Sequence, residues 1–403
     1  ADETDAMFGE LYSWYLRNPE YRSRVQKLVQ SAFAGKPEDI ISQSVAKALY
    51  GEVSPYSATR LERFAACAFA HFLQYGMKLT ERVEYEFKPM DMGNVMHEAL
   101  ESFAEEVRKR GMKWTELTEQ ERNEIADRCL DNIVADYGNT VLKSSARNEY
   151  MIERTRRILR RTVWALQKQL EQGEFQPEGF EVTFGGGRID RVDIMEDQNK
   201  VYVKVIDYKT GNTSFDLVYL YHGLQLQLMI YLDGALRVEQ KKYPDKEIIP
   251  AGVFYYNIKD PMIQEKIDAD VEAVSAGLMK ELKMNGLVQA DPELVYRMDS
   301  SLGSIPVAFN KDGSFRKNSS VADRTQFAVL GRYVRTKIEK IRSSILEGDA
   351  EVSPYELGKK NACTYCPYMT VCGFDRRLSG YEFRRLKNFS DEELWKAFDR
   401  EAE

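Results

Sequence analysis

Residues 187–211 read GRIDRVDIMEDQNKVYVKVIDYKTG and form the stretch that decides the fold. Two runs of alternating apolar and polar residues flank a polar turn at residues 196–199. This alternation is typical of two antiparallel strands joined by a short loop, each with one apolar face. We therefore predict a β-hairpin here, with its apolar face in the protein core.

Charged residues mark the open end of this predicted hairpin. Because side chains alternate between the two faces of a strand, Asp207 and Lys209 share a face with the valines of the second run. Asp190 shares a face with the apolar residues of the first run, whereas Asp193 and Lys204 lie on the opposite faces. If the apolar faces pack into one core, two carboxylates and an ammonium group meet at its rim. This arrangement predicts a divalent-metal site with a charge to steady a hydroxide. The D-x-K sequence alone is more typical of a surface ion pair, so the interpretation depends on the rest of the chain.

Helical patterns surround the hairpin. Ser57 is a suitable N-cap for one helix, and Thr118 with Glu121 has the spacing of a capping box at the start of another. The predicted helices cover residues 58–75, 118–135, 151–171, 217–238 and 321–347. Together with the hairpin they predict an α/β fold.

Composition indicates a soluble globular protein. The chain has 403 residues, of which 43% are hydrophobic and 30% charged, enough for two or three domains or one large domain with helical insertions. No apolar run approaches the length of a membrane span, the first residues are not a signal peptide, and no phosphate-binding G-x-x-x-x-G-K-[ST] sequence occurs. Because the sequence lacks an initiator Met, we expect it to be a piece of a longer protein.

Any contact with nucleic acid must use local basic patches, because the net charge of −7 gives no attractive global field. Such runs are usually solvated helix faces. Arg154, Arg157, Arg161 and Arg377 are the candidate DNA contacts. They belong to two clusters, which comprise Arg154, Arg156, Arg157, Arg160 and Arg161, and Arg376, Arg377, Arg384, Arg385 and Lys387.

The cysteines are clustered. Cys363, Cys366 and Cys372 have the spacing C-x2-C-x5-C, Cys67 lies far upstream, and Cys129 stands alone as a small hydrophobe. Three thiols within ten residues indicate a metal or cluster site. Zinc usually draws its ligands from two local pairs, whereas a fourth ligand from the far end of the chain suits an iron–sulfur cluster. Spacing alone leaves iron–sulfur, zinc and reduced thiols open.

Four motifs stand in a fixed order inside this cysteine frame. They are G-x-x-x-H at Gly93–His97, G-x-I-D at Gly187–Asp190, D-Y-K-T-G at Asp207–Gly211 and a glutamine-rich helix at Gln225–Tyr231. In this order and with this frame, residues 51–403 resemble the RecB-like branch of the PD-(D/E)XK nucleases. Within that branch they resemble the C-terminal nuclease domains of the AddB subunits of bacterial AddAB helicase–nucleases.

The resemblance implies roles for individual residues. Lys209 matches the catalytic lysine, Gln225 or Gln227 matches the glutamine that supports the site, and Tyr231 matches a tyrosine whose position varies. The metal ligands matched are His97, Asp190, Asp207 and the backbone carbonyl of Tyr208, and the matched ligands of a [4Fe–4S] cluster are Cys67, Cys363, Cys366 and Cys372.

The resemblance also implies an architecture and an activity. The expected core is a small mixed sheet of restriction-endonuclease type, flanked by helices and closed by an iron–sulfur clasp. Residues 1–50 would be the helical remnant of an upstream region, and residues 51–403 the nuclease domain. The expected activity is Mg²⁺- or Mn²⁺-dependent exonuclease cleavage of the 5′-terminated single strand in the bacterial cytoplasm. An AddA-like subunit would supply the helicase motor during double-strand-break processing and recombination.

Two other functions remain open. One is a stand-alone iron–sulfur exonuclease resembling the CRISPR adaptation nucleases, which are usually much shorter. The other is a catalytically inert module that binds DNA ends or acts as a scaffold.

Overall fold

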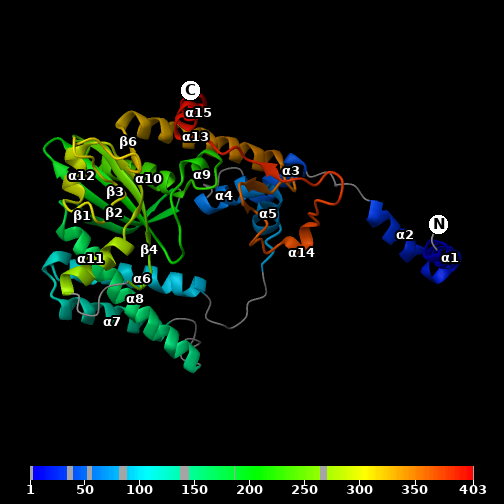
Figure 1. Ribbon diagram of the computed structural model, residues 1–403, viewed down its shortest axis with the longest axis horizontal. Helices are drawn as coiled ribbons and strands as arrows, with labels where there is room; N and C mark the ends of the chain where they lie inside the picture. Colours follow the sequence, from blue (N-terminus) through cyan, green and yellow to red (C-terminus); the bar gives the residue numbers. More distant parts are fainter. Residues whose placement is uncertain are drawn as a thin grey trace. The chain divides into compact units, whose positions relative to one another are not determined.

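The computed structural model describes residues 3–33, 40–51, 57–80, 89–136, 145–185, 187–263 and 270–402 (Figure 1). The chain divides into two compact units, which we call the cysteine unit and the sheet unit. The cysteine unit comprises Ala1–Tyr50, Ala66–Leu79 and Ser344–Lys387, and the sheet unit comprises Gly51–Ala65, Thr80–Ser343 and Asn388–Glu403.

The sheet unit is built on a six-stranded mixed sheet in the order β1-β2-β3-β4-β5-β6. The first three strands form an antiparallel meander, β4 lies parallel to β3, β5 is antiparallel to β4, and β6 is parallel to β5. The strands are β1 (Gln176–Phe184), β2 (Gly187–Asp197), β3 (Lys200–Lys209), β4 (Glu247–Asn257), β5 (Asn285–Gln289) and β6 (Val321–Ala322).

The predicted hairpin is formed by β2 and β3. Their register pairs Val192 with Val205 and Ile194 with Val203, so the apolar residues of both strands share one face, as predicted. The strands meet at a two-residue loop in which Gln198 has a φ of 48°, because such tight turns need left-handed backbone. The same register places Asp193 opposite Lys204 on the other face of the sheet.

Helices cover the sheet on both faces. Buried side chains of β2 to β4, including Met195, Ile206 and Phe254, form one core with residues of α6, α7 and α8. Helix α10 packs on β3 and β4 from the other side (Figure 1). The mixed sheet flanked by helices confirms the predicted fold class. The main helices of this unit are α4 (Ala58–Ala66), α6 (Pro89–Lys109), α7 (Glu119–Asp136), α8 (Ala146–Glu171), α10 (Gln227–Lys242) and α13 (Arg324–Glu347), of which α4 and α13 extend past the unit boundary.

Shorter elements complete this unit. The capping box predicted at the start of α7 is present, since the N–H of Thr118 donates to Glu121 Oε2 at 3.0 Å and the N–H of Glu121 donates to Thr118 Oγ1 at 3.3 Å. The remaining elements are η2 (Trp114–Glu116), α9 (Leu217–Tyr221), α11 (Val271–Glu281), α12 (Pro292–Met298) and α15 (Asp391–Ala402). Within the described residues, no helix has both the length and the apolar character needed to cross a membrane.

The predicted helix over residues 217–238 is in fact two helices. Helix α9 ends at Tyr221, Gly223 adopts a left-handed φ of 77°, and α10 begins only at Gln227. A left-handed residue cannot continue an α-helix, so the glycine ends the first one. The interruption leaves Gln225 in the connecting loop and puts Gln227 in the first turn of α10.

The cysteine unit is smaller. Its helices are α1 (Glu3–Arg17), α2 (Pro19–Phe33), α3 (Gln43–Tyr50), α5 (Ala68–His71), the π-helix η1 (Phe72–Gly76) and α14 (Met369–Cys372). Its sheet has the order β8-β7-β9, formed by β8 (Lys360–Asn361), β7 (Tyr355–Leu357) and β9 (Arg384–Arg385). This unit joins residues 1–50 with the segments that carry Cys67 and the three late cysteines, and the predicted division into residues 1–50 and 51–403 stays a prediction.

The predicted helix over residues 58–75 is interrupted at Cys67. This residue has extended backbone, with φ −166° and ψ 116°, between the end of α4 and the start of α5. An extended residue breaks the helical hydrogen-bond ladder and turns the chain, so the thiol does not lie on a helix face as the periodic pattern predicts.

A buried ion cluster lies on the sheet face opposite the valines. Asp193 accepts hydrogen bonds from Arg191 Nε at 2.5 Å and pairs with Lys204 Nζ at 2.9 Å, and its side chain is 0% exposed. Burial alone would raise the pKa of Asp193, but the charges of Arg191 and Lys204 together outweigh it and lower the pKa. The guanidinium of Arg191 also lies 5.6 Å from the Trp114 ring and 5.7 Å from the Phe180 ring. Through Arg191 the cluster therefore links the hairpin to Trp114 on η2 and Phe180 on β1.

We expect Asp193→Asn to lower the free energy of unfolding by about 3–5 kcal/mol, because it leaves two buried cations without their counter-charge. Chemical denaturation measures this change. The matched control is Asp131→Asn, which removes an exposed partner of Arg156 and should cost less than about 1 kcal/mol. Equal effects of the two changes would show that the buried cluster does not stabilise the hairpin.

Candidate functional site

Two buried carboxylates meet at the end of the hairpin. Asp190 on β2 accepts a hydrogen bond from the backbone N–H of Tyr208 at 2.7 Å, which brings it beside Asp207 on β3. Burial raises the pKa of Asp207 to about 7, with a further contribution from the negative charge of Asp190. The positive charge of Lys209 partly offsets this rise in the pKa of Asp207, since its Nζ lies 2.6 Å from Asp207 Oδ2. Asp190, Asp207 and Lys209 therefore converge as the alternation of the strands predicted.

His97 reaches this site from α6. Its Nδ1 lies 3.4 Å from Asp190 Oδ2 and 3.7 Å from Glu181 Oε1. Burial lowers the pKa of the imidazole, but hydrogen bonds and charges from the two carboxylates together outweigh it and raise the pKa to about 10. Gly93, one turn earlier on α6, faces Thr210 just beyond β3, so the first turns of the helix lie against the end of the hairpin.

Glu181 on β1 is a site residue that the sequence reasoning missed. The pairs Phe180 with Arg191 and Val182 with Ile189 flank it, so it stands across the ladder from Asp190. Its backbone has a φ of 49°, which is unfavourable for a side chain of this kind and costs of order 1–3 kcal/mol. Its side chain is 6% exposed and pairs with the exposed Arg188. No local sequence signal marks Glu181, because only the β1–β2 register brings it to Asp190.

The donor atoms fit a divalent cation. One ligand atom from each of His97, Glu181 and Asp190 lies within 4.8 Å of the other two. Carboxylate oxygens are the ligands that Mg²⁺ and Mn²⁺ prefer, and an imidazole nitrogen is compatible with them. Asp207 lies near enough for the charge of Asp190 to raise its pKa, and its role as a further ligand stays a prediction. Tyr208 lies between the two strands' carboxylates, and its carbonyl as a ligand stays a prediction.

Lys209 is held by a glutamine at the start of α10. Its Nζ donates to Gln227 Oε1 at 2.7 Å, and Gln227 Nε2 donates to the hydroxyl of Tyr231 at 2.9 Å. Gln225 lies elsewhere, since its amide bonds the backbone of Asp216 at 2.9 Å and that of Ser214 at 2.8 Å. Of the two candidate glutamines, the structure brings only Gln227 to the lysine.

A second group of candidate ligands lies within the cysteine unit. Cys67 and Cys366 share an apolar cluster that includes Leu73 and Tyr368. The Tyr368 hydroxyl donates to the Leu79 carbonyl at 2.9 Å, which links the late cysteine loop to the segment after Cys67. The loop itself is shaped by Asn361, whose side chain accepts from the N–H of Cys363 at 2.9 Å.

The thiols lie close enough to influence one another. Burial, followed by the charges of Cys67, Cys366 and Cys372, raises the pKa of Cys363 to about 12. Burial also raises the pKa of Cys67, although N–H groups of Ala70, Ser353 and Phe69 act in the opposite direction. No disulfide joins the five cysteines, which are all in the described ranges. Four neighbouring cysteines whose thiolate forms repel one another fit a site where a metal or cluster supplies positive charge.

Comparison with known sequences identifies the family. The sequence pattern of the PD-(D/E)XK nuclease superfamily matches residues 55–373. The chain belongs to the PD-(D/E)XK nuclease superfamily. The matched range of this chain includes the candidate metal ligands at the hairpin end and the candidate cysteine ligands from Cys67 to Cys372.

Relatives in bacteria have a narrower description. The chain is 41% identical over its full length to the B subunit of the ATP-dependent helicase/deoxyribonuclease of Lachnoclostridium phytofermentans, covering 36% of that protein. It is 34% identical, also over its full length, to the protein of the same description from Thermoanaerobacter sp. (strain X514), covering 37% of it. The chain thus spans just over a third of the length of these two proteins, and the match supports the predicted resemblance.

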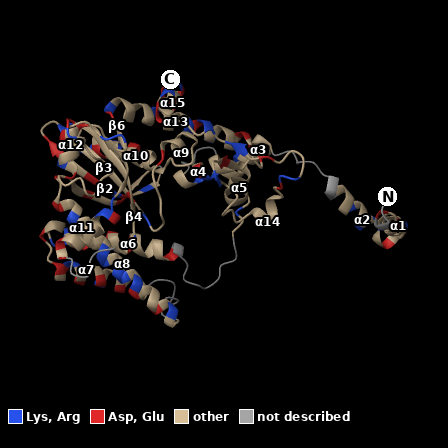
Figure 2. Cartoon of the chain, in the orientation of Figure 1, with Lys and Arg blue, Asp and Glu red and all other residues tan. Residues whose placement is uncertain are grey.

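The candidate DNA-binding arginines mostly have partners within their own units. Arg157 pairs with Asp260 at 2.6 Å, and Arg161 stacks on Trp164 at 5.2 Å. Figure 2 shows the basic residues of α8 beside the acidic residues of α7, and Arg156 and Arg160 both pair with Asp127. In the cysteine unit, Arg377 pairs with Asp375 at 2.6 Å. These contacts give the clusters a structural role, and DNA binding by Arg154, Arg157, Arg161 and Arg377 stays a prediction.

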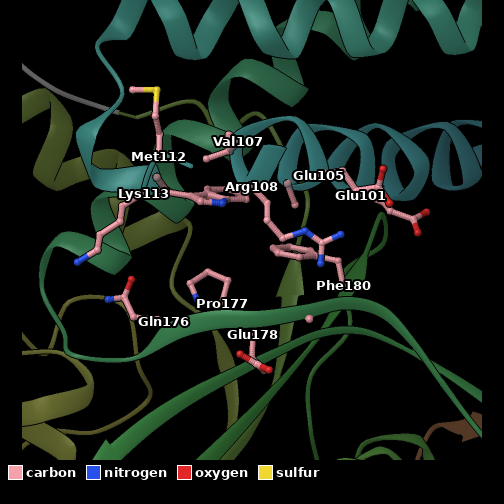
Figure 3. A pocket seen from close by; sticks show the side chains of 13 residues that line it. Glu101, Glu105, Val107, Arg108, Met112, Lys113, Gln176, Pro177, Glu178 and Phe180 are labelled. Carbon is pink, nitrogen blue, oxygen red and sulfur yellow. The ribbon is translucent and has the colours of Figure 1, made fainter. Parts of the chain in front are cut away.

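A separate cavity of about 190 Å³ lies between α6, η2 and β1 (Figure 3). Trp114 and Phe180 stack at its wall, and Arg108, Lys113 and Glu178 line it. None of the four candidate metal-binding side chains, those of His97, Glu181, Asp190 and Asp207, lines this cavity. The candidate nuclease site therefore lies at the hairpin end and not in this cavity.

We expect the wild-type chain to bind Mn²⁺ and Glu181→Gln to weaken that binding by at least about tenfold, because loss of a ligand or its close partner typically costs 10–100-fold. Electron paramagnetic resonance of free Mn²⁺ measures the affinity. Glu196→Gln, at the exposed far end of β2, is the control and should bind as the wild type does. Unchanged binding in Glu181→Gln would remove Glu181 from the site.

Proposed function

We propose that this chain is a divalent-metal-dependent deoxyribonuclease module that degrades single-stranded DNA. The observation that carries the proposal is the convergence of His97, Glu181, Asp190 and Asp207 with Lys209 in a member of a nuclease superfamily. Metal-assisted phosphodiester hydrolysis needs this combination of hard ligands and a nearby cation.

The residues divide the work of hydrolysis. His97, Glu181, Asp190 and Asp207 would hold Mg²⁺ or Mn²⁺, which supplies an acidified water and charge compensation for the phosphate. Lys209 presents an ammonium group beside these ligands, where it stabilises the charge that develops on the phosphate oxygens. Gln227 and Asp207 hold this ammonium from two sides, so its position is set before substrate binds.

Substrate and partners follow from the relatives. Those proteins are described as B subunits of ATP-dependent helicase/deoxyribonucleases. We infer that this chain acts on single strands delivered by an AddA-like motor subunit in the bacterial cytoplasm, during double-strand-break processing and recombination. Its preferred strand would be the 5′-terminated one, with AddA cutting the other.

We expect the purified chain to shorten labelled single-stranded DNA with Mg²⁺ or Mn²⁺, and EDTA to stop the reaction. Asp207→Ala and Lys209→Ala should each reduce the rate by about 10²–10³-fold, since they remove a ligand and the charge nearest the phosphate. Labels at the two ends report which end is attacked. Lys246→Ala, in an exposed pair with Glu196, is the control and should retain the rate.

Cleavage by the purified chain at the wild-type rate in both variants would refute this site. Metal and DNA binding without cleavage in the wild type would favour the inert end-binding module instead.

We further propose that Cys67, Cys363, Cys366 and Cys372 hold a [4Fe–4S] cluster with a structural role. All four thiols belong to one compact unit although Cys67 is remote in sequence. Linking such distant segments removes conformational entropy from the unfolded chain, on the order of 5 kcal/mol by analogy with disulfides. The cluster would then join the Cys67 segment to the late cysteine loop.

An anaerobic absorption spectrum with iron and zinc analysis tests the cluster. We expect a brown protein with about four irons per chain, and we expect Cys363→Ala to lose the colour and the cooperative melting transition. Cys129→Ala, in α7 of the sheet unit, is the control and should keep both. One zinc without colour would refute the cluster, and a colourless Cys363→Ala variant with unchanged melting would refute its structural role.

A further inference from the structure

Helix α10, which presents Gln227 to Lys209, begins without a capping residue of its own. Its N-cap is Leu226, an apolar residue that makes no side-chain cap hydrogen bond. The first N–H groups of a helix have no partner within the helix and need an acceptor from elsewhere. The first turn of α10 is also the turn that carries the candidate site glutamine.

Glu62 on α4 provides that acceptor. Its Oε1 accepts from the N–H of Leu226 at 2.7 Å and from the N–H of Gln227 at 2.9 Å. The two residues are more than 160 positions apart from Glu62 in the sequence, so this is a tertiary cap. A carboxylate at this position also complements the positive end of the helix dipole.

The neighbouring contacts hold α4 against this turn. Leu61 and Ala65, on either side of Glu62, are buried. A Cβ at Gly223 would lie 3.2 Å from Ala65 Cβ, closer than such atoms usually come. The left-handed glycine that ends α9 therefore also lets α4 approach the start of α10.

The hydrogen bonds continue from Glu62 into the candidate nuclease site. Gln227 receives the Glu62 contact through its backbone and gives its side-chain Oε1 to Lys209 Nζ and its Nε2 to Tyr231. Holding the backbone of Gln227 in place sets where its side chain begins, and therefore how its Oε1 meets Lys209 Nζ. The ammonium group itself is bonded to Gln227 and Asp207, so the hydrogen bonds link Glu62 to Lys209 through Gln227.

We propose that Glu62 is a positioning residue for the nuclease reaction, which acts by holding the first turn of α10 so that Gln227 orients the ammonium group of Lys209. This inference rests on the function proposed above. Glu62 acts as a hydrogen-bond acceptor in this role. A neutral amide oxygen at the same place can accept from the same two N–H groups, whereas a methyl group cannot.

The test compares Glu62→Ala with Glu62→Gln in the full chain, with single-stranded DNA and Mn²⁺. We expect Glu62→Ala to lower kcat about tenfold and to leave KM within about twofold, because DNA contacts remain and only the lysine is misplaced. Glu62→Gln should recover most of kcat. The matched control is Asp291→Ala, which removes a cap that also accepts from two N–H groups, those of Glu293 and Leu294 on α12. It should leave kcat unchanged.

A double-mutant cycle separates positioning from general loss of structure. If Glu62 acts through Gln227, Glu62→Ala should cause no further loss of kcat in a Gln227→Ala background. Hydrogen exchange measured by mass spectrometry gives a readout without catalysis. Glu62→Ala should speed exchange of the amides at the start of α10 by at least about tenfold and leave β3 protected.

Unchanged exchange at the start of α10, unchanged kcat in Glu62→Ala, or an equal loss of kcat in the two backgrounds would each overturn the proposal. A different result is a wild type that does not cleave DNA, together with faster exchange at the start of α10 in Glu62→Ala. In that case the proposed nuclease function fails and Glu62 only stabilises the helix. This outcome also overturns the role of Glu62 in catalysis.

Discussion

The register between β2 and β3 is the constraint on which the candidate nuclease site depends. It pairs Asp193 with Lys204 on one face and brings the Asp190 carboxylate to the Tyr208 N–H on the other. Because side chains alternate along a strand, a slip of one residue would exchange the two faces. The slip would place the site carboxylates on the face packed by α6 to α8 and the ion cluster on the face packed by α10, so that neither group would meet its partners. One register therefore fixes both a stabilising charge cluster and a reactive one.

The elements around the hairpin supply the candidate site residues that the hairpin itself does not carry. Helix α6 brings His97 and β1 brings Glu181, so that with Asp190 on β2 three elements contribute candidate ligands. On the other side, α10 brings Gln227 to Lys209, and α4 holds the start of that helix through Glu62. The site is thus assembled by tertiary contacts around a locally determined centre.

This division explains how much the sequence could predict. The mixed α/β fold and the convergence of Asp190, Asp207 and Lys209 follow from alternation, which is a local property of two adjacent strands. Glu181 was missed because its position depends on a register with another strand and on a left-handed backbone that no residue type announces. The single helix predicted over residues 217–238 was wrong because Gly223 ends α9, and the start of α10 at Gln227 has no local signal because its cap comes from α4. The spacing of Cys363, Cys366 and Cys372 predicted a metal or cluster site and the resemblance added Cys67, yet neither could show that Cys67 interrupts its helix.

The electrostatics of the site follow from this assembly. Asp190, Asp207, Glu181 and Glu62 bring four carboxyl groups close to two cationic side chains, His97 and Lys209. The raised pKa of Asp207 and of Glu62, each to about 7 and each due first to burial, shows the cost of gathering such groups away from water. A bound cation would lower this cost, because a ligand that binds only the folded state stabilises it. The opposite face of the same two strands carries instead a charge-compensated cluster, Asp193 with Arg191 and Lys204. Stability and reactivity are therefore separated by the two faces of a single hairpin.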